Sequence, residues 1–500
     1  MNKLKLFSIV ALIAMVLAAC GPAATEAPAA TDAPAATDAP AAMDAPSATA
    51  TPEAAQAPTS ELMVREESQP IPGGPVLLWS GIEIRTVAFT DAASIKLSLH
   101  PITGDIYVLN PGTGLRKIQI SESDRLEKVA NPEDIVDDAF LSGMAFGPDG
   151  ALYVVANRTV DNDYNQGIIR KGIADVDGTF QWKTLAESEP YPLSGTPFDH
   201  KFNGIVVSPD GNWVYVNSGS RTDHGEEENN GTIFQDVREV ALTTKILRIP
   251  ADAENLLLPN DENALNADGL IFASGTRNAF DLEFAPNGDL FGVDNGPDAD
   301  FPDELNWLRE GHHYGFPWKF GNQDNPQQFP NYTSIGDKRL SPDFTAVQIG
   351  AYRRDPEFPP SPGGFTLPVS NLGPDADQYR ADDGSQHDFS DEGIPLYTFT
   401  PHRSPLGLAF GTSADLPLDY RSTETTFSAF LLSWGAAGGT LTDKGQDLLH
   451  LRLTKTGDNY QAVTTQIATG FSNPIDSVLI GNKLYVLDYS GGTLWELTFR

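Results

Sequence analysis

From about residue 95 to the C-terminus, apolar and polar residues alternate in short stretches that are interrupted by Pro-Asp-Gly-like turns. An alternation with a period of two predicts strands that bury one face. Asp-Gly and Asn-Gly supply the positive φ angles that tight hairpin turns require. The clearest stretches are residues 144–154, 205–216 and 282–291. Each is therefore predicted to form a β-hairpin.

The same hairpin unit recurs along the chain, which indicates a repeat architecture. The weaker copies are residues 97–108, 406–410 (followed by the apolar stretch 430–432, without the short turn) and 476–486. The six copies predict an all-β fold, a six-bladed β-propeller with four-stranded antiparallel blades, over residues 75–500. A β-sandwich is the alternative, but its strands would not recur in a fixed two-strand unit.

Between residue 321 and about residue 400 the chain is rich in Pro, Gly and Asp and has few strand signals. Long excursions of this kind usually belong to functional loops. We expect this segment to lie on one face of the propeller.

The N-terminal residues have the pattern of a targeting signal. Lys3 and Lys5 precede an apolar run over residues 6–19 that is too short to span a bilayer comfortably. Residues 17–21, Leu-Ala-Ala-Cys-Gly, resemble a bacterial lipobox, in which Cys20 would be acylated. The alternative is a buried or accidental cysteine. Residues 1–20 are thus predicted to be a lipoprotein signal peptide, and the mature protein to be extracytoplasmic and lipid-anchored.

Residues 21–62 consist mostly of Ala, Pro, Thr and Asp, and cannot bury a core. They are predicted to be a disordered tether. The whole chain has a formal charge of −35, which argues against a nucleic-acid partner, because a phosphate binder needs a basic surface. The same charge disfavours an anionic membrane surface, so we expect membrane association only through the lipid.

Several motifs follow one another in the middle of the chain. They are Gly-Thr-Arg-Asn at 275–278, Asn-Gly-Pro at 295–297, Asp-Glu-Leu-Asn at 303–306 and Tyr-Gly-Phe-Pro-Trp at 314–318. This order resembles the signature of the glucose/sorbosone dehydrogenases, the soluble sugar dehydrogenases that depend on pyrroloquinoline quinone (PQQ). The resemblance implies oxidation of an aldose or related sugar by hydride transfer to PQQ, with a small sugar as substrate. It leaves the electron acceptor open.

The resemblance also assigns roles to single residues. His200, which precedes the Pro-Asp-Gly turn at 209–211, corresponds to the catalytic base of the family. Imidazole suits that task, because it is neutral and basic near pH 7. A loop histidine that pairs with Asp199 or with solvent is the alternative.

Arg277 and Asn278 correspond to the quinone contacts of the family, and the backbone carbonyls of Gly296 and Pro297 to its calcium ligands. A guanidinium can pair with a quinone oxygen or a carboxylate, and calcium accepts backbone oxygens readily. A structural arginine in a blade loop is the alternative for Arg277. For Asp303 and Glu304 three roles stay open: they order this loop through hydrogen bonds, cap a helix or form a plain solvated turn.

Two segments depart from the family pattern. Residues 433–439 offer no cation where relatives carry a polar or basic motif, and Ser-Gly-Ser-Arg at 218–221 replaces a Gly-Asp pair. Arg221 is nevertheless placed to reach a cofactor carboxylate. The acidic run 226–228 is read as a solvated loop.

Two other functions remain open from the sequence. One is a non-catalytic surface propeller that binds a glycan or a protein. The other is a gluconolactonase-like metal-dependent hydrolase, which would need carboxylate ligands that converge on the propeller axis. No Gly-x-Ser-x-Gly elbow, His-Glu-x-x-His helix or phosphate-binding Gly-rich loop is present in the chain.

Overall fold

The computed structural model describes residues 74–120, 125–435, 439 and 441–500. Cys20 and the predicted signal peptide and tether lie outside these residues, as do positions 436–438 of the loop at 433–439. Within the described part of the chain, no helix is long and apolar enough to cross a membrane.

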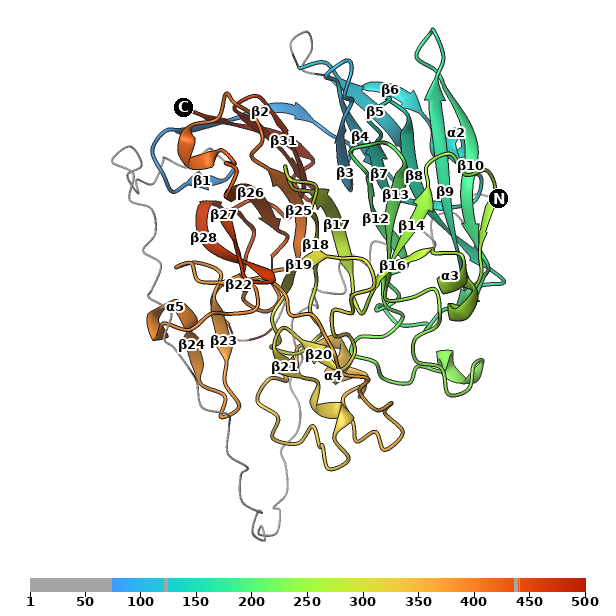
Figure 1. Cartoon of the computed structure of the whole chain (residues 1–500), viewed down its shortest axis with the longest axis vertical. Coiled ribbons are helices and arrows are strands. Elements are labelled where there is room, and N and C mark those ends of the chain that lie inside the picture. Colours follow the sequence, from blue (N-terminus) through green and yellow to red (C-terminus); the bar gives the residue numbers. More distant parts are fainter. Residues whose placement is uncertain (1–73, 121–124, 436–438, 440) are drawn as a thin grey trace.

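Six sheets surround a central axis, so the prediction of an all-β six-bladed propeller is confirmed (Figure 1). The first three blades, from the inner strand outward, are β3 (Lys96–Leu99), β4 (Ile106–Asn110), β5 (Gly114–Ile118) and β6 (Glu127–Ala130); β7 (Phe140–Phe146), β8 (Leu152–Val160), β9 (Tyr164–Ala174) and β10 (Phe180–Ser188); and β12 (Phe202–Val207), β13 (Trp213–Ser218), β14 (Lys245–Pro250) and β16 (Ile271–Ser274).

The remaining blades are β17 (Ala279–Phe284), β18 (Leu290–Asp294) and β19 (Glu304–Leu308); β25 (Pro405–Phe410), β26 (Thr426–Ser433), β27 (Asp447–Thr456) and β28 (Asn459–Thr469); and β29 (Pro474–Ile480), β30 (Lys483–Asp488), β31 (Thr493–Phe499) and β2 (Ile82–Phe89). The fourth blade thus pairs three strands. Each of the six sequence repeats lies on the inner strand of one blade, and five of them, all but the copy at 406–410, continue through its hairpin turn.

Short elements complete the blades and their connections. They are β1 (Val76–Leu77), α2 (Pro132–Ile135), β11 (Tyr191–Pro192), η1 (Asn230–Thr232), β15 (Leu256–Leu258), α3 (Glu262–Ala267), β20 (Lys319–Phe320), β21 (Gln323–Asp324) and η3 (Leu418–Tyr420). Both β15 and β11 extend the second blade, and β1 pairs with β28 of the fifth.

The ring is closed by strands from the two ends of the domain. The N-terminal β2 pairs with the C-terminal β31, in antiparallel register from Ile82↔Phe499 to Phe89↔Thr493. The last blade therefore contains three strands from the C-terminus and one from the N-terminus. This pairing holds the first and last blades together, because β3 continues from β2 into the first blade.

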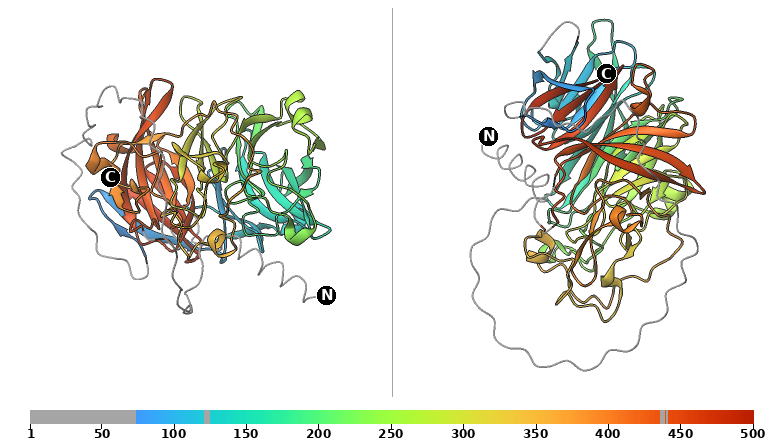
Figure 2. Two further views of the ribbon diagram at one scale, coloured as in Figure 1. Left: turned by 90° about the horizontal axis from the view of Figure 1, so that it is seen from below. Right: turned by 90° about the vertical axis from the view of Figure 1, so that its left-hand side faces the viewer.

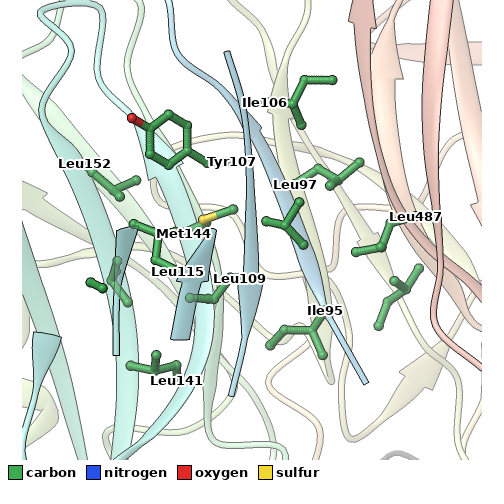
Figure 3. Close-up of a cluster of buried hydrophobic side chains, with 14 of the residues drawn as sticks. Ile95, Leu97, Ile106, Tyr107, Leu109, Leu115, Leu141, Met144, Leu152 and Leu487 are labelled. Atoms are coloured by element: carbon green, nitrogen blue, oxygen red, sulfur yellow. The ribbon is translucent and has the colours of Figure 1, made fainter. Parts of the chain in front are cut away.

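The core fills the spaces between neighbouring blades. Figure 3 shows one such cluster, in which Leu97, Leu109 and Met144 from the first two blades pack toward Leu487 of β30. All are buried. Fully burying a side chain of this kind contributes roughly 1.5–3 kcal/mol. Blade-to-blade packing of this type makes long amphipathic helices unnecessary.

The excursion at 321–400 forms a lobe with little regular structure (Figure 2). Its elements are η2 (Pro326–Gln328), α4 (Thr345–Gln348), β22 (Ser370–Asn371), β23 (Gln378–Arg380), β24 (Gln386–Asp388) and α5 (Phe389–Glu392). Ala346, Ala351 and Tyr352 of this lobe pack in a small core with Phe301 and Phe316 of the propeller loops. The excursion is thus anchored to the loops that carry the candidate site.

Candidate active site

The loops that lead into β12 and β17 meet at the start of these inner strands, together with the loop that follows β13. The Ser220 backbone N–H donates to the Arg277 carbonyl over 2.7 Å, and Asn203 Nδ2 donates to Asn278 Oδ1 over 2.7 Å. These bonds bring His200, Arg277 and Asn278 together from two blades.

His200 has a defined tautomer. Its Nδ1 lies 3.3 Å from the Ser220 carbonyl and 3.0 Å from Ser220 Oγ, and the Oγ in turn donates to the Thr222 carbonyl. A carbonyl only accepts hydrogen bonds, so Nδ1 carries the proton and Nε2 has a free lone pair. No described residue bonds to Nε2. Burial and the nearby Arg277 guanidinium lower the pKa of His200 to about 3, so the ring is neutral near pH 7.

The fold leaves little freedom around this histidine. A Cβ atom at Gly219 would lie 2.5 Å from His200 Cβ, so the loop has room only for glycine there. Asp199, the alternative partner of His200, instead accepts the backbone N–H groups of Ser194 and Gly195. His200 is therefore positioned by Ser220 and not by a carboxylate.

Protein acceptors orient the Arg277 side chain but do not accept all of its N–H groups. Its Nε donates to the Asp223 carbonyl (2.7 Å), one terminal nitrogen to Asp223 Oδ1 (2.8 Å) and the other to the Asn295 carbonyl (3.2 Å). One N–H on each terminal nitrogen remains without a partner among the described residues. The backbone N–H groups of Arg277 and Asn278 both donate to Asp294, which fixes the start of β17.

Arg221 differs from Arg277 in this respect. Its five N–H bonds all point to backbone carbonyls, those of Pro192, Leu193, Glu228, Val237 and Arg238. The side chain is buried. In this structure Arg221 ties three loop segments together and has no donor left for a cofactor, so we do not carry it into the proposed site.

The Gly296-Pro297 step is held by Asp303. Asp303 Oδ1 accepts the Gly296 N–H (2.7 Å), and its Oδ2 accepts the Ser404 N–H (2.8 Å). The Pro297 carbonyl accepts the Ala299 N–H (2.8 Å), whereas the Gly296 carbonyl has no donor among the described residues. Asp303 thus orders this loop, one of the three roles that the sequence left open for it.

The backbone oxygens of Gly296 and Pro297, which lie beside acidic side chains, are ligands of the type that calcium prefers. Asp298, which follows Pro297, accepts the backbone N–H of Ala346 from the excursion. Burial, followed by the charge of Asp223, raises the pKa of Asp298 to about 6. No cluster of three or more His, Cys, Asp or Glu side chains that would hold a metal lies in the described ranges. Any ion at this step would depend on the two carbonyls.

The acidic run at 226–228 is not the solvated loop that we expected. Glu226 is fully buried, and its carboxylate accepts the backbone N–H groups of Asp223 (2.8 Å) and His224 (2.7 Å). Asp223 and His224 were not singled out in the sequence either. Their role depends on Arg277 and on the excursion, both far away in the chain, so no local pattern reveals it.

Residues 141–346 match the glucose/sorbosone dehydrogenase family model. This segment contains His200, Arg277, Asn278, Gly296 and Pro297. The chain is 27% identical over 270 residues to quinoprotein glucose dehydrogenase B of Acinetobacter calcoaceticus, over 48% of this chain and 51% of that protein. It therefore spans about half the length of this curated relative.

Solved structures agree with the fold. The soluble aldose sugar dehydrogenase of Escherichia coli aligns with a TM-score of 0.53 and 17% identity, over 84% of this chain and 100% of that one. The holo form of the pyranose dehydrogenase PQQ domain of Coprinopsis cinerea aligns with a TM-score of 0.52 and 14% identity, over 84% and 96%. At such identities the likeness concerns the propeller fold alone, while the family match supports the resemblance over residues 141–346.

Proposed function

We propose that this protein is a sugar dehydrogenase that oxidises an aldose or a related sugar by hydride transfer to PQQ. The observation that carries the proposal is the proximity of two side chains with atoms that have no partner among the described residues: His200, through its unprotonated Nε2, and Arg277, through two of its N–H bonds. The match of residues 141–346 to the family model supports it.

His200 would act as the general base. Oxidation of a sugar C–OH group releases a proton from the hydroxyl oxygen and a hydride from the carbon that bears this hydroxyl. The proton passes to Nε2, and the hydride and its electron pair pass to the acceptor, so the carbon becomes a carbonyl. Because Nδ1–H is bonded to Ser220, Nε2 is the ring atom whose lone pair is available for that proton.

The cofactor would be held by the residues that the resemblance assigns. Arg277 and Asn278 would bind quinone or carboxylate oxygens, and the carbonyls of Gly296 and Pro297 would bind calcium. Two N–H bonds of Arg277 and the Gly296 carbonyl have no partner in the described part of the chain, which fits this use. When bound, PQQ supplies the two-electron acceptor.

Reconstitution tests the proposal directly. Apoprotein mixed with calcium and PQQ should gain dye-linked oxidation activity on at least one aldose, with the corresponding lactone as product. Calcium alone and PQQ alone serve as controls. A protein that binds sugars but shows no turnover under these conditions would instead be a non-catalytic propeller. Release of acid from an added lactone without PQQ would indicate a hydrolase.

We also propose that the mature protein is held outside the cytoplasm by acyl chains on Cys20. The support is the lipobox-like sequence at residues 17–21 and the presence of a single cysteine in the chain. The tether at 21–62 would then separate the propeller from the membrane.

A further inference from the structure

Asp223, which bonds to Arg277, also contacts His224, a histidine that the proposed mechanism does not use. The His224 side chain is fully buried and stacks on Tyr352, with ring centroids 3.8 Å apart and an angle of 11° between the planes. Its Nδ1 lies 2.9 Å from Asp223 Oδ2 and 3.4 Å from Glu226 Oε2, and its Nε2 lies 3.0 Å from Gln327 Oε1.

The partners of His224 determine where its protons are. Gln327 Oε1 also accepts the Arg353 backbone N–H (3.3 Å), so this atom is an oxygen acceptor and His224 Nε2 must donate to it. On the other side of the ring, Nδ1 faces two carboxylates. Both nitrogens therefore carry protons, and His224 is an imidazolium.

The carboxylates around His224 accept several further hydrogen bonds. Glu226 accepts two backbone N–H bonds, and Asp223 accepts bonds from Arg277, the Asp298 N–H (3.0 Å) and the Tyr352 hydroxyl (3.3 Å). Burial alone would raise the pKa of Asp223, but the hydrogen bond from His224 and the charge of Arg277 lower it to about 2. Burial would likewise lower the pKa of His224, but Glu226 and Asp223 raise it above its usual value.

We propose that His224 is a positioning residue: as a buried cation it balances Asp223 and Glu226, so that Arg277 keeps its orientation and its charge for an anionic ligand. His224 and Arg277 thus face Asp223 and Glu226, and Asp298 lies beside Asp223 as a further acidic group. A neutral residue at position 224 would remove one of the two cations, so a ligand with carboxylate groups would meet a more negative site. The inference rests on the proposed function, because it concerns the arginine that we expect to bind PQQ.

The excursion supplies the other half of the arrangement. Gln327 lies in η2, and Tyr352 lies just after α4. Gln327 fixes the second proton of His224, and Tyr352 covers the ring and bonds to Asp223. The lobe at 321–400 would thus set the charge behind Arg277 without contacting the cofactor.

The first test needs no cofactor. Nitrogen-15 NMR of the full apo chain should show both ring nitrogens of His224 protonated at pH 7.5, and the Arg277 Nε–H should exchange slowly with solvent. In His224→Gln this N–H should exchange at least tenfold faster. A neutral ring at position 224, or unchanged exchange in the variant, would overturn the inference whether or not the protein oxidises sugars.

The second test uses the reconstituted enzyme. His224→Gln should raise the PQQ concentration needed for half-maximal activity at least tenfold, with turnover at saturating PQQ within about threefold. Gln327→Met, which removes the acceptor shared by His224 Nε2 and the Arg353 N–H, should shift that concentration in the same direction and provides a second variant in case His224→Gln does not fold. The control is His450→Gln, another buried histidine, which bonds to Ser428 in the fifth blade.

The outcomes separate the two proposals. The control should lower thermal stability without changing the PQQ requirement. If the His224 and Gln327 variants lose stability but keep the wild-type PQQ requirement, His224 is merely structural and the inference is wrong. If the wild-type chain neither binds PQQ nor oxidises any sugar, the proposed function fails, and the NMR measurements alone decide about His224.

Discussion

At the scale of single residues, two arginines with similar burial have different uses. Every side-chain N–H of Arg221 donates to a backbone carbonyl, whereas Arg277 has one N–H on each terminal nitrogen that no described residue accepts. From the sequence both were candidates for the cofactor, since both lie near family-like motifs. Only the placement of acceptors, which comes from distant loops, distinguishes a structural guanidinium from one that is available to a ligand.

His200 and Arg277 should fail in different ways when they are replaced. His200→Ala removes the proton acceptor, so turnover should fall by about a hundred- to ten-thousand-fold while the PQQ concentration for half-maximal activity changes little. Arg277→Ala removes a charge-assisted contact and should raise that PQQ concentration by at least about tenfold, given 1.5–3 kcal/mol for hydrogen bonds to charged groups. Activity measured against PQQ concentration for both variants checks this. Near wild-type turnover in His200→Ala would refute the mechanism.

At the scale of elements, the repeat unit was a reliable guide. Pro-Asp-Gly and Asn-Gly turns between alternating stretches predicted the inner hairpins, because a tight turn requires particular residues at fixed positions. Strand β2 shows what such patterns miss. Its partner, β31, is at the other end of the chain, and pairing over that separation leaves no local mark. The buried cluster of Asp223, His224 and Glu226 was missed for the same reason, since Gln327 and Tyr352 complete it from the excursion.

The closing strand makes a prediction of its own. Deleting residues up to Phe89 removes β2 together with the short β1 and exposes β31, the partner of β2, in addition to losing the buried side chains of Ile82 and Val87. At roughly 1.5–3 kcal/mol for each fully buried side chain, the free energy of unfolding should fall by at least about 3 kcal/mol. Denaturant unfolding measures this. A chain lacking only residues 1–62 is the control and should match the wild-type stability; equal stability of the two truncations would contradict the role of β2.

At the scale of the whole molecule, acidic groups on the inner strands contribute to the response to pH. Burial, followed by the charges of Asp281 and Asp476, raises the pKa of Glu283 to about 8. Burial and the charge of Asp281 raise the pKa of Asp476 to about 7, against the opposing effect of Lys96. Lys96 Nζ pairs with Asp281 (2.9 Å), so three blades meet at these charges.

This arrangement predicts lower stability at alkaline pH. Glu283 and Asp476 bind protons more tightly in the folded than in the unfolded chain, so the free energy of unfolding should fall as the pH rises from about 5 to about 8. The melting temperature should be higher at pH 5.5 than at pH 8.5. Glu283→Gln removes one of these protons and should reduce the difference by a few degrees, while Glu254→Gln, at an exposed position, should leave it unchanged. An equal difference in Glu283→Gln would refute the assignment.

Membrane attachment belongs to this scale as well. If acylated Cys20 is the anchor, Cys20→Ser should move the protein from the membrane fraction to the soluble extracytoplasmic fraction. The variant should keep the wild-type melting temperature and sugar oxidation, because position 20 lies far from the propeller in the sequence. Retention of the variant in membranes after a high-salt wash would show that another feature holds the protein there.

The pairing of β2 with β31 also sets the order of events during biosynthesis. About 400 residues separate the end of β2 from the start of β31, so at roughly 5–20 residues per second the ribosome needs about 20–80 s to make the partner of a strand it has already released. During that time β2 has no partner strand. An unpaired strand edge invites association with other chains. Nascent chains of this protein should therefore depend on a holding chaperone until residue 499 has emerged.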